Sequence, residues 1–308
     1  MGSVRRRVAD KLRQVRGSGS EPAWSAERNI VITGPGRSGT TLTCHLLNKL
    51  PNTVALSEPI NPGKYADRLP DTDAVADGIQ DFYREQRRMA LNKGMVLSKH
   101  VGGVVPDNPK GMVDGVRKRV VEKGKISVGK DLSPDFFLGV KQTGIFTAML
   151  PALVNRFACF AIVRNPLAIR ASSMSIESDK KGRKDRASAR ITYDATLGER
   201  MEAKKSEGAD VIDKWLLRMH SSFERYQQSL PPENIIRYED LCESNGRALS
   251  VIVPAAATLD EPLENKNKNP LYDREKVRAV GERLLRSEGA YWNFYTRESV
   301  EEIMDGLQ

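Results

Sequence analysis

The sequence predicts an α/β fold in which a P-loop-type parallel sheet is flanked by helices. Short apolar runs typical of buried strands alternate along the chain with segments whose apolar residues recur at helical spacing. A glycine-rich loop, residues 34–41, separates the first such run from the first helical segment. The 308 residues, 39% of them apolar, are enough to form a substantial core.

The predicted sheet begins at residues 29–33, an apolar run that ends at Gly34-Pro35-Gly36. Residues 40–48 follow with leucines at helical spacing, so the order is strand, loop, helix. Further strands are predicted at 157–163 and 234–238, and further helices at 167–176, 211–229 and 274–286. This alternation favours a parallel sheet.

The chain is predicted to divide into a flexible basic arm, residues 1–28, and one domain, residues 29–308. The arm is rich in arginine and ends in a Gly-Ser stretch without a core pattern. Two polar segments, at about 61–125 and 178–208, interrupt the domain. We expect neither to join the sheet, and we expect both to be insertions near the active site that form an acceptor site and a lid.

The composition indicates the charge of the expected ligand and the expected cellular compartment. The formal net charge of +9 favours an anionic ligand. The three cysteines form no CxxC pattern, so neither a disulfide framework nor a metal site is expected. No run reaches the roughly 18 apolar residues of a membrane span, and the N-terminus lacks an apolar signal region. The expectation is a cytoplasmic protein without a membrane span.

The glycine-rich loop has the length of a Walker A sequence and the position that phosphate binding requires. Backbone N–H groups and the positive end of the helix dipole would converge on an anion, with Thr40 and Thr41 adding hydroxyl donors. However, Thr40 stands where the Walker lysine should follow the second glycine. This replacement argues against hydrolysis of ATP or GTP.

The loop, Gly-x-x-Arg-Ser-Gly-Thr-Thr-Leu from Gly34, resembles the 5′-phosphosulfate loop of sulfotransferases that use 3′-phosphoadenosine 5′-phosphosulfate (PAPS). It is closest to the tyrosylprotein and carbohydrate branches. Two more elements match in the family's order, Arg164-Asn165-Pro166 with Ser172 eight residues after Arg164, and residues 237–241, Arg-Tyr-Glu-Asp-Leu. The resemblance covers residues 29 to about 241.

This resemblance implies a sulfotransferase-like fold and PAPS as cofactor, with adenosine 3′,5′-bisphosphate as product. A guanidinium and a hydroxyl would together hold the 3′-phosphate. The cofactor-binding residues implied are Gly36, Arg37, Ser38, Gly39, Thr40, Thr41, Arg164, Ser172 and Tyr238. Lys266 and Lys268 are further candidates for the 3′-phosphate.

Sulfuryl transfer to a hydroxyl needs a base for the acceptor proton and cations for the leaving oxygen. Glu58, 21 residues after Arg37 and before Pro59, resembles the catalytic glutamate of the tyrosylprotein branch and is the expected base. The proline disfavours helix at this position, which places the carboxylate at a strand end. His100 competes, because Ser98-Lys99-His100 resembles the Lys-x-His of cytosolic small-molecule sulfotransferases, although it lies too far from Arg164 for that branch.

The cations expected at the sulfuryl group are Arg37 and Lys141. Lys141 precedes the 157–163 strand, where the family commonly has Lys-x-Pro, but Thr143 replaces the proline. Lys130 therefore stays an alternative.

The resulting hypothesis is a PAPS-dependent sulfotransferase that acts on a hydroxyl of a carbohydrate or another small-molecule or lipid acceptor. No nucleic-acid partner is expected. Two alternatives are a P-loop kinase that uses ATP and a non-enzymatic nucleotide-binding module in which the basic arm matters most.

Overall fold

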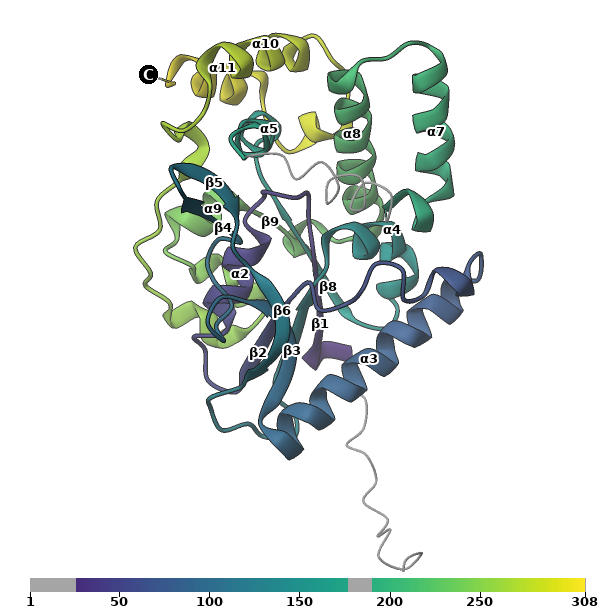
Figure 1. Cartoon of the computed structure of the whole chain (residues 1–308), viewed down its shortest axis with the longest axis vertical. Helices are drawn as coiled ribbons and strands as arrows, with labels where there is room; N and C mark the ends of the chain where they lie inside the picture. Colours follow the sequence, from purple (N-terminus) through teal and green to yellow (C-terminus); the bar gives the residue numbers. More distant parts are fainter. Residues whose placement is uncertain (1–25, 177–189, 308) are drawn as a thin grey trace, which may run out of the picture.

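A five-stranded parallel sheet forms the centre of the protein in the computed structural model, which describes residues 26–176 and 190–307 (Figure 1). The strand order is β2-β7-β1-β8-β9, and every neighbouring pair is parallel. The strands are β1 Asn29–Thr33, β2 Thr53–Ser57, β7 Phe137–Lys141, β8 Ala158–Val163 and β9 Ile235–Arg237. Every residue of β1 and β2 is buried, as expected for a parallel sheet covered on both faces.

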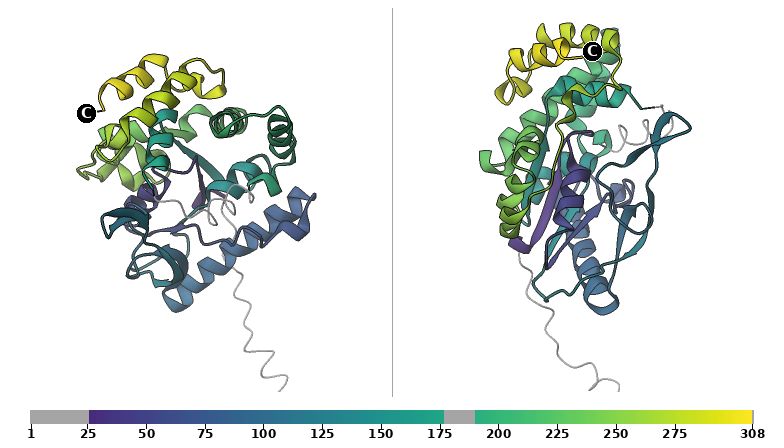
Figure 2. Two further views of the ribbon diagram at one scale, coloured as in Figure 1. Left: turned by 45° about the horizontal axis from the view of Figure 1, so that its top comes forward. Right: turned by 90° about the vertical axis from the view of Figure 1, so that its left-hand side faces the viewer.

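Helices flank this sheet on both sides (Figure 2), which confirms the predicted fold class. They are α2 Thr40–Leu47, α3 Thr72–Lys93, α4 Thr143–Leu153, α5 Pro166–Met174, α7 Ala195–Ser206, α8 Val211–Ser229, α9 Tyr238–Glu243, α10 Arg274–Leu285 and α11 Arg297–Asp305. Short 3-10 helices span Ala26–Arg28, Ala66–Arg68, Pro232–Asn234, Arg247–Val251, Pro254–Thr258, Lys266–Lys268 and Ala290–Asn293. None of the helices in the described ranges is long and apolar enough to cross a membrane.

The strand predicted at 234–238 is wrong at its C-terminal end. Tyr238 is the first residue of α9, and the following acidic residues Glu239 and Asp240 occupy the first turn of that helix. Negative side chains are favoured there because the N-terminus of a helix carries a partial positive charge.

Two small antiparallel sheets lie beside the central one. In the first, β3 (Met95–His100) pairs with β6 (Glu122–Ser127). In the second, β4 (Lys110–Val113) and β5 (Val116–Arg119) form a hairpin. Its two-residue turn, Asp114-Gly115, has positive φ at both positions, the requirement of a tight type I′ connection.

Residues 61–125 contribute no strand to the central sheet, as expected, but α3 within this segment belongs to the hydrophobic core. Val75, Ile79 and Tyr83 recur at helical spacing and are completely buried. The Tyr83 hydroxyl donates a hydrogen bond to the Ile30 carbonyl at 2.7 Å, which fixes α3 against β1. Charged neighbours obscured this apolar stripe in the sequence. The β3–β6 pair and the hairpin lie in the part of the segment that follows α3.

Parts of the other two expected segments lie outside the described residues. These are residues 1–25 of the predicted arm and residues 178–189 of the predicted lid. The described part of the second segment contains α7, whose Leu197 is buried, and Tyr193, whose hydroxyl donates to the Pro62 carbonyl at 2.8 Å. These residues pack against the body of the protein.

Helix α2 packs against β2 through a buried thiol. Cys44 is fully buried, and its Sγ donates to the Leu56 carbonyl at 3.7 Å. Burial raises the pKa of Cys44 to about 12. Cys159 and Cys242 are also buried and free, so all three cysteines are reduced and shielded from solvent.

The order of the strands determines where a ligand can bind. From β1 the chain first moves to β2 on one side of the sheet and later to β8 on the other. Crevices form at the carboxyl ends of strands where the connections diverge in this way. The glycine-rich loop leaves β1 at this point.

Candidate functional site

A cleft with a volume of about 500 Å³ lies at the carboxyl ends of the strands. Its size falls within the range of small-molecule sites. The basic side chains that line it are Arg37, Lys99, Lys110, Arg117, Arg119, Lys141, Arg164 and Lys266, and the acidic ones are Glu58, Asp107 and Glu264. The excess of basic residues makes an anion the favoured ligand.

The glycine-rich loop forms the floor of the cleft. Gly39 precedes α2 with a φ of 94°, and a Cβ there would lie 2.7 Å from Cδ2 of Tyr238. Only glycine therefore fits this position. Thr40 and Thr41 occupy the N-terminus of α2 and line the cleft together with Gly36. Free N–H groups and the helix dipole at such an end favour an anion.

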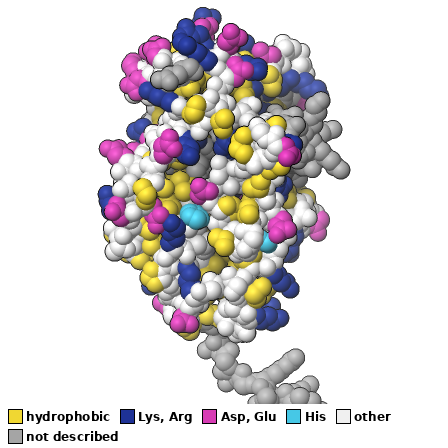
Figure 3. All heavy atoms as spheres, turned by 60° about the vertical axis from the view of Figure 1, so that its left-hand side comes forward, with side chains coloured by type: hydrophobic (Ala, Val, Ile, Leu, Met, Phe, Trp, Pro, Cys, Tyr) yellow, Lys and Arg dark blue, Asp and Glu magenta, His cyan; other side chains and the backbone are white. Residues whose placement is uncertain are grey.

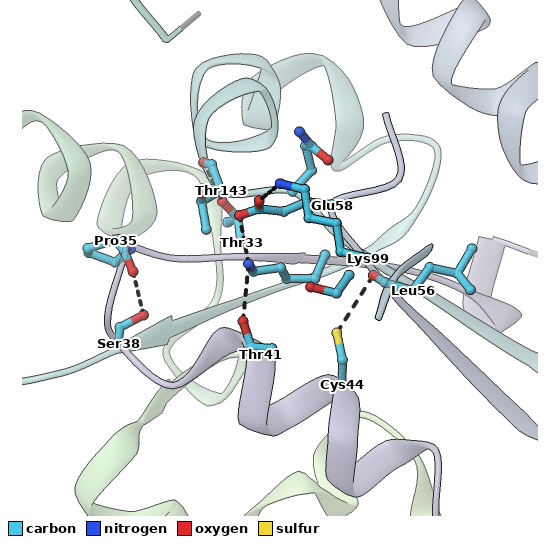
Figure 4. Close-up of polar contacts among 12 residues, drawn as sticks. Thr33, Pro35, Ser38, Thr41, Cys44, Leu56, Glu58, Lys99 and Thr143 are labelled. Carbon is cyan, nitrogen blue, oxygen red and sulfur yellow. Dashed lines mark hydrogen bonds and ion pairs between the residues drawn. The ribbon is translucent and has the colours of Figure 1, made fainter. Parts of the chain in front are cut away.

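Ser38 has a different place from the other loop residues. Its hydroxyl donates to the carbonyl oxygens of Ile162, at 2.6 Å, and Pro35, at 2.8 Å. The bond to Ile162 ties the loop to β8, whereas the bond to Pro35 stays within the loop (Figure 4). The side chain does not line the cleft. Its role in the structure is to shape the loop.

Arg37 and Ser172 meet at one end of the cleft. Arg37 has a φ of 78°, a conformation uncommon for a residue other than glycine. Its Nε donates to the Ser172 hydroxyl at 3.1 Å, and its Nη2 donates to Oδ1 of Asn108 at 3.3 Å. Burial, reinforced by the charges of Arg117 and Arg164, lowers the pKa of Arg37 to about 10. The side chain is still a cation at neutral pH.

Arg164 completes this group, and we call Arg37, Arg164 and Ser172 the arginine end. The Arg164 side chain is almost fully buried. Its Nε donates to Oδ1 of Asn267 at 2.7 Å and its Nη1 to the Arg37 carbonyl at 3.1 Å. Its Nη2 is buried without a hydrogen-bond partner in the described part of the chain. An unpaired buried donor is costly, so this nitrogen is suited to a ligand.

Tyr238 supports the arginine end from the side. Its ring lies 4.3 Å from the Arg164 guanidinium carbon, in the geometry of a cation–π contact. Its hydroxyl accepts from the Lys266 N–H at 3.2 Å and donates to the Glu264 carbonyl at 3.3 Å. Lys266 lines the cleft. Lys268 packs close to Gly306 and does not line the cleft.

Glu58, Lys99 and Lys141 form a second group of cleft residues, which we call the carboxylate end. Figure 4 shows Glu58 beside Lys99. Glu58 follows β2 directly with a φ of 45°, and its N–H donates to the Lys141 carbonyl at 2.7 Å. Lys141 Nζ lies 2.8 Å from Glu58 Oε1 and 3.4 Å from the Thr41 hydroxyl, while Lys99 pairs with Oε2. Lys141 thus lies between the carboxylate and the loop.

The two lysines determine the charge of Glu58. Burial alone would raise the pKa of this carboxyl group, but the positive charges and hydrogen bonds of Lys141 and Lys99 outweigh it. The pKa is lowered well below its usual range, and Glu58 is ionised at neutral pH. Burial lowers the pKa of Lys99, an effect that the Glu58 carboxylate partly offsets.

The structure separates the candidates that the sequence left open. His100 is buried, accepts a hydrogen bond from the Gly103 N–H at 3.1 Å, and does not line the cleft. Its neighbour Lys99 reaches Glu58 because successive residues of a strand point to opposite faces. Sequence reasoning missed Lys99 by considering its motif only for the histidine.

Lys130 is also absent from the cleft lining. Its Nζ donates to the carbonyl oxygens of Asn48, Leu50 and Thr53 at 2.6–3.0 Å. These bonds hold the connection between α2 and β2, so the lysine that the structure brings to Glu58 and the loop is Lys141.

The β4–β5 hairpin lies over the cleft and contributes side chains that the sequence did not single out. Asn108, just before β4, contacts Arg37, and Arg117 of β5 donates to the Ser175 hydroxyl at 3.1 Å. Lys110 and Arg119 also line the cleft. On the face shown in Figure 3, basic, acidic and hydrophobic side chains are interspersed.

Comparisons with known proteins add little to this geometry. No protein-family model and no curated protein matches the chain. Among solved structures, the chain is similar to a sulfotransferase domain from the Synechococcus PCC 7002 olefin synthase. The identity is 10%, the match covers 92% of this chain and 96% of that one, and the TM-score is 0.32. A likeness this weak supports no assignment of activity.

Proposed function

We propose that this protein is a sulfotransferase that uses PAPS and transfers its sulfuryl group to a hydroxyl of a carbohydrate or another small-molecule or lipid acceptor. The observation that carries the proposal is the buried Arg164 guanidinium with its unpaired Nη2, beside Ser172 and the glycine-rich loop. This arrangement suits a phosphate group, because a guanidinium donates to phosphate oxygens in a fixed fork.

The residues present fit PAPS at both of its charged groups. Arg164 and Ser172, with Lys266 nearby, would hold the 3′-phosphate. Arg37 and the N-terminus of α2, with Thr40 and Thr41, would hold the phosphosulfate. When bound, PAPS supplies an activated sulfuryl group and a leaving phosphate.

The carboxylate end suits the other half of the reaction. Glu58 is ionised and can accept the proton of an acceptor hydroxyl. Lys141, between Glu58 and Thr41, is placed to stabilise negative charge that develops on oxygen atoms at the loop. Lys99 holds the second carboxylate oxygen and orients the group.

The binding test uses adenosine 3′,5′-bisphosphate and its analogue adenosine 5′-monophosphate, which lacks the 3′-phosphate. We expect calorimetry to show tighter binding of the bisphosphate to the wild-type protein. Arg164→Ala should weaken this binding by roughly 1.5–3 kcal/mol and abolish most of the preference for the 3′-phosphate. Arg297→Ala is the control, because Arg297 stacks on Trp292 and does not line the cleft.

Two results would contradict the proposal. Absence of bisphosphate binding to the wild-type protein would remove the PAPS assignment. Equal affinities of the wild type and Arg164→Ala would remove Arg164 from the 3′-phosphate site.

A P-loop kinase is the second candidate, and one contact favours it. Although the loop itself has no lysine at the Walker position, Lys141 Nζ lies 3.4 Å from the Thr41 hydroxyl, so a lysine reaches the loop from β7. The same calorimetry with ATP and Mg²⁺ separates the candidates. Tighter binding of ATP than of adenosine 3′,5′-bisphosphate would favour the kinase.

A further inference from the structure

The hairpin carries basic residues along the length of the cleft. On β5, Arg117 and Arg119 are two positions apart and both line the cleft, whereas Lys118 between them does not. This follows from the alternation of side chains in a strand. The hairpin therefore presents Arg117 and Arg119 on the face that lines the cleft.

The two arginines of β5 face different ends of the cleft. Arg117 is close enough to Arg37 to lower its pKa, and Arg119 is close enough to Lys99 to lower the pKa of that lysine. Arg117 thus lies toward the arginine end and Arg119 toward the carboxylate end. The chain order agrees with this placement. Arg119 is followed by Val121, which also lines the cleft, and then by β6, which pairs with the strand that contains Lys99.

Arg119 differs from the other cations of the cleft in its partners. Lys99 and Lys141 pair with Glu58, Lys266 lies 3.6 Å from Glu264, and Arg117 donates to Ser175. The Arg119 side chain, by contrast, makes neither a hydrogen bond nor an ion pair within the described residues, and it is exposed. Its charge faces the end of the cleft where the acceptor hydroxyl would meet Glu58.

We propose that the acceptor is an anionic hydroxyl compound and that Arg119 binds its charged group beside the reacting hydroxyl. This inference rests on the proposed function and narrows its acceptor class. The arginine end and the loop provide for the charges of PAPS, so Arg119 is left for a second anion. The positive charge of the neighbouring Lys99 and Lys141 strengthens the attraction for that anion and disfavours a cationic acceptor.

The test compares hydroxyl compounds in two forms that differ only in charge, a carboxylate and its neutral primary amide. A glucuronide, a hydroxyphenylacetate and an ω-hydroxy fatty acid, each with its amide, sample sugar, phenol and lipid acceptors. Each compound is titrated by calorimetry into protein saturated with adenosine 3′,5′-bisphosphate. We expect at least one carboxylate to bind about tenfold more tightly than its amide, the effect of one charge-assisted contact.

Two variants identify the residue responsible. Arg119→Ala should remove most of the preference for the carboxylate, whereas Lys118→Ala, the adjacent cation outside the cleft, should keep it. Because Arg119 is exposed, we expect its removal to leave the fold and the affinity for the bisphosphate unchanged. Melting temperature and bisphosphate affinity are therefore measured for each variant.

The outcomes separate this inference from the proposed function. If the bisphosphate does not bind to the wild-type protein, the proposed function fails and this inference fails with it. If the bisphosphate binds but no carboxylate binds better than its amide, only the acceptor class is wrong. If a preference exists and survives in Arg119→Ala, the anionic class stands, and the assignment of Arg119 is overturned.

Discussion

The basic side chains at the two ends of the cleft differ in the charge of their partners. At the carboxylate end, Lys99 and Lys141 share the single Glu58 carboxylate, which offsets one of their two positive charges. At the arginine end, the hydrogen-bond partners of Arg37 and Arg164 among the described residues are neutral, namely a serine hydroxyl, side-chain amides and a backbone carbonyl. Neutral partners orient a guanidinium without cancelling its charge. The arginine end therefore favours the binding of an anion, whereas the carboxylate end keeps the Glu58 carboxylate ionised.

The largest expected effect comes from removing the charge of Glu58. Glu58→Gln keeps the size of the side chain and one of its two acceptor oxygens but cannot accept a proton, so we expect sulfate transfer to fall about 10²–10⁴-fold. Single-turnover transfer from labelled PAPS, with an acceptor found by screening, measures this loss. Bisphosphate binding should persist, since the arginine end is intact. A wild-type rate in Glu58→Gln together with loss of transfer in His100→Ala would make the histidine the base.

Lys141 and Lys130 provide the next test of the carboxylate end. Lys141→Ala removes the cation between Glu58 and Thr41, and we expect transfer to fall about 10²–10³-fold, the usual loss for one preorganised donor. Lys130→Ala should instead lower the melting temperature, because three carbonyl groups lose their donor, while the transfer rate of the folded protein is retained. The opposite pattern would assign the sulfuryl contact to Lys130.

A glycine pair tests the geometry of the arginine end. Gly39→Ala places a methyl group 2.7 Å from the Tyr238 ring in addition to imposing an unfavourable φ, so we expect a loss of about 1–3 kcal/mol in stability and weaker bisphosphate binding. Gly94→Ala has a positive φ but no atom within 4 Å of the new methyl group. It should cost about 1 kcal/mol and leave binding unchanged. Chemical denaturation and calorimetry compare the two, and equal losses in both variants would mean that the Tyr238 contact does not constrain the loop.

The smallest expected effect is a pH dependence confined to the carboxylate end. The pKa of Glu58 is lowered in the folded protein, so its contribution to the free energy of unfolding is complete above its unfolded pKa of about 4.3. Below that pH the contribution decreases as the pH falls toward the folded pKa. We expect the stability difference between wild type and Glu58→Gln to be constant from pH 7 to pH 5 and to shrink in more acid solution. A difference that grows on acidification would contradict the lowered pKa.

Much of the fold was predictable because local patterns agree with the tertiary structure. The strand at Asn29–Thr33 and the helix at Val211–Ser229 have the predicted bounds, since each has a strong apolar pattern and clear boundaries. Strand β7 was not predicted. It has Gly139 at its centre, and its position between β1 and β2 comes from pairing with segments far away in the sequence. Such pairing leaves no local signal.

The candidate site also contains residues that the sequence could identify and residues that it could not. The sequence could single out Glu58 and Lys141 because the residues around each resemble sulfotransferase motifs, and the structure places both at or next to strand ends. The sequence could not single out Arg117 and Arg119. Charged residues at 110–125 look like a solvated surface until the hairpin folds over the loop, and that arrangement depends on contacts such as Asn108 with Arg37.

The buried cysteines make the chain its own reporter of local opening. Thiol reagents attack the thiolate, and a thiol with no exposed surface reacts only when its surroundings open. The alkylation rate of Cys44 therefore reports how often α2 separates from β2 beneath the loop. Cys242 donates to the Glu264 carbonyl at 3.8 Å, so its alkylation rate reports how often the segment around Glu264, which also accepts from Tyr238, moves away. The labelling rates of the two cysteines, followed by mass spectrometry, compare local opening on the two sides of the cleft without any introduced probe.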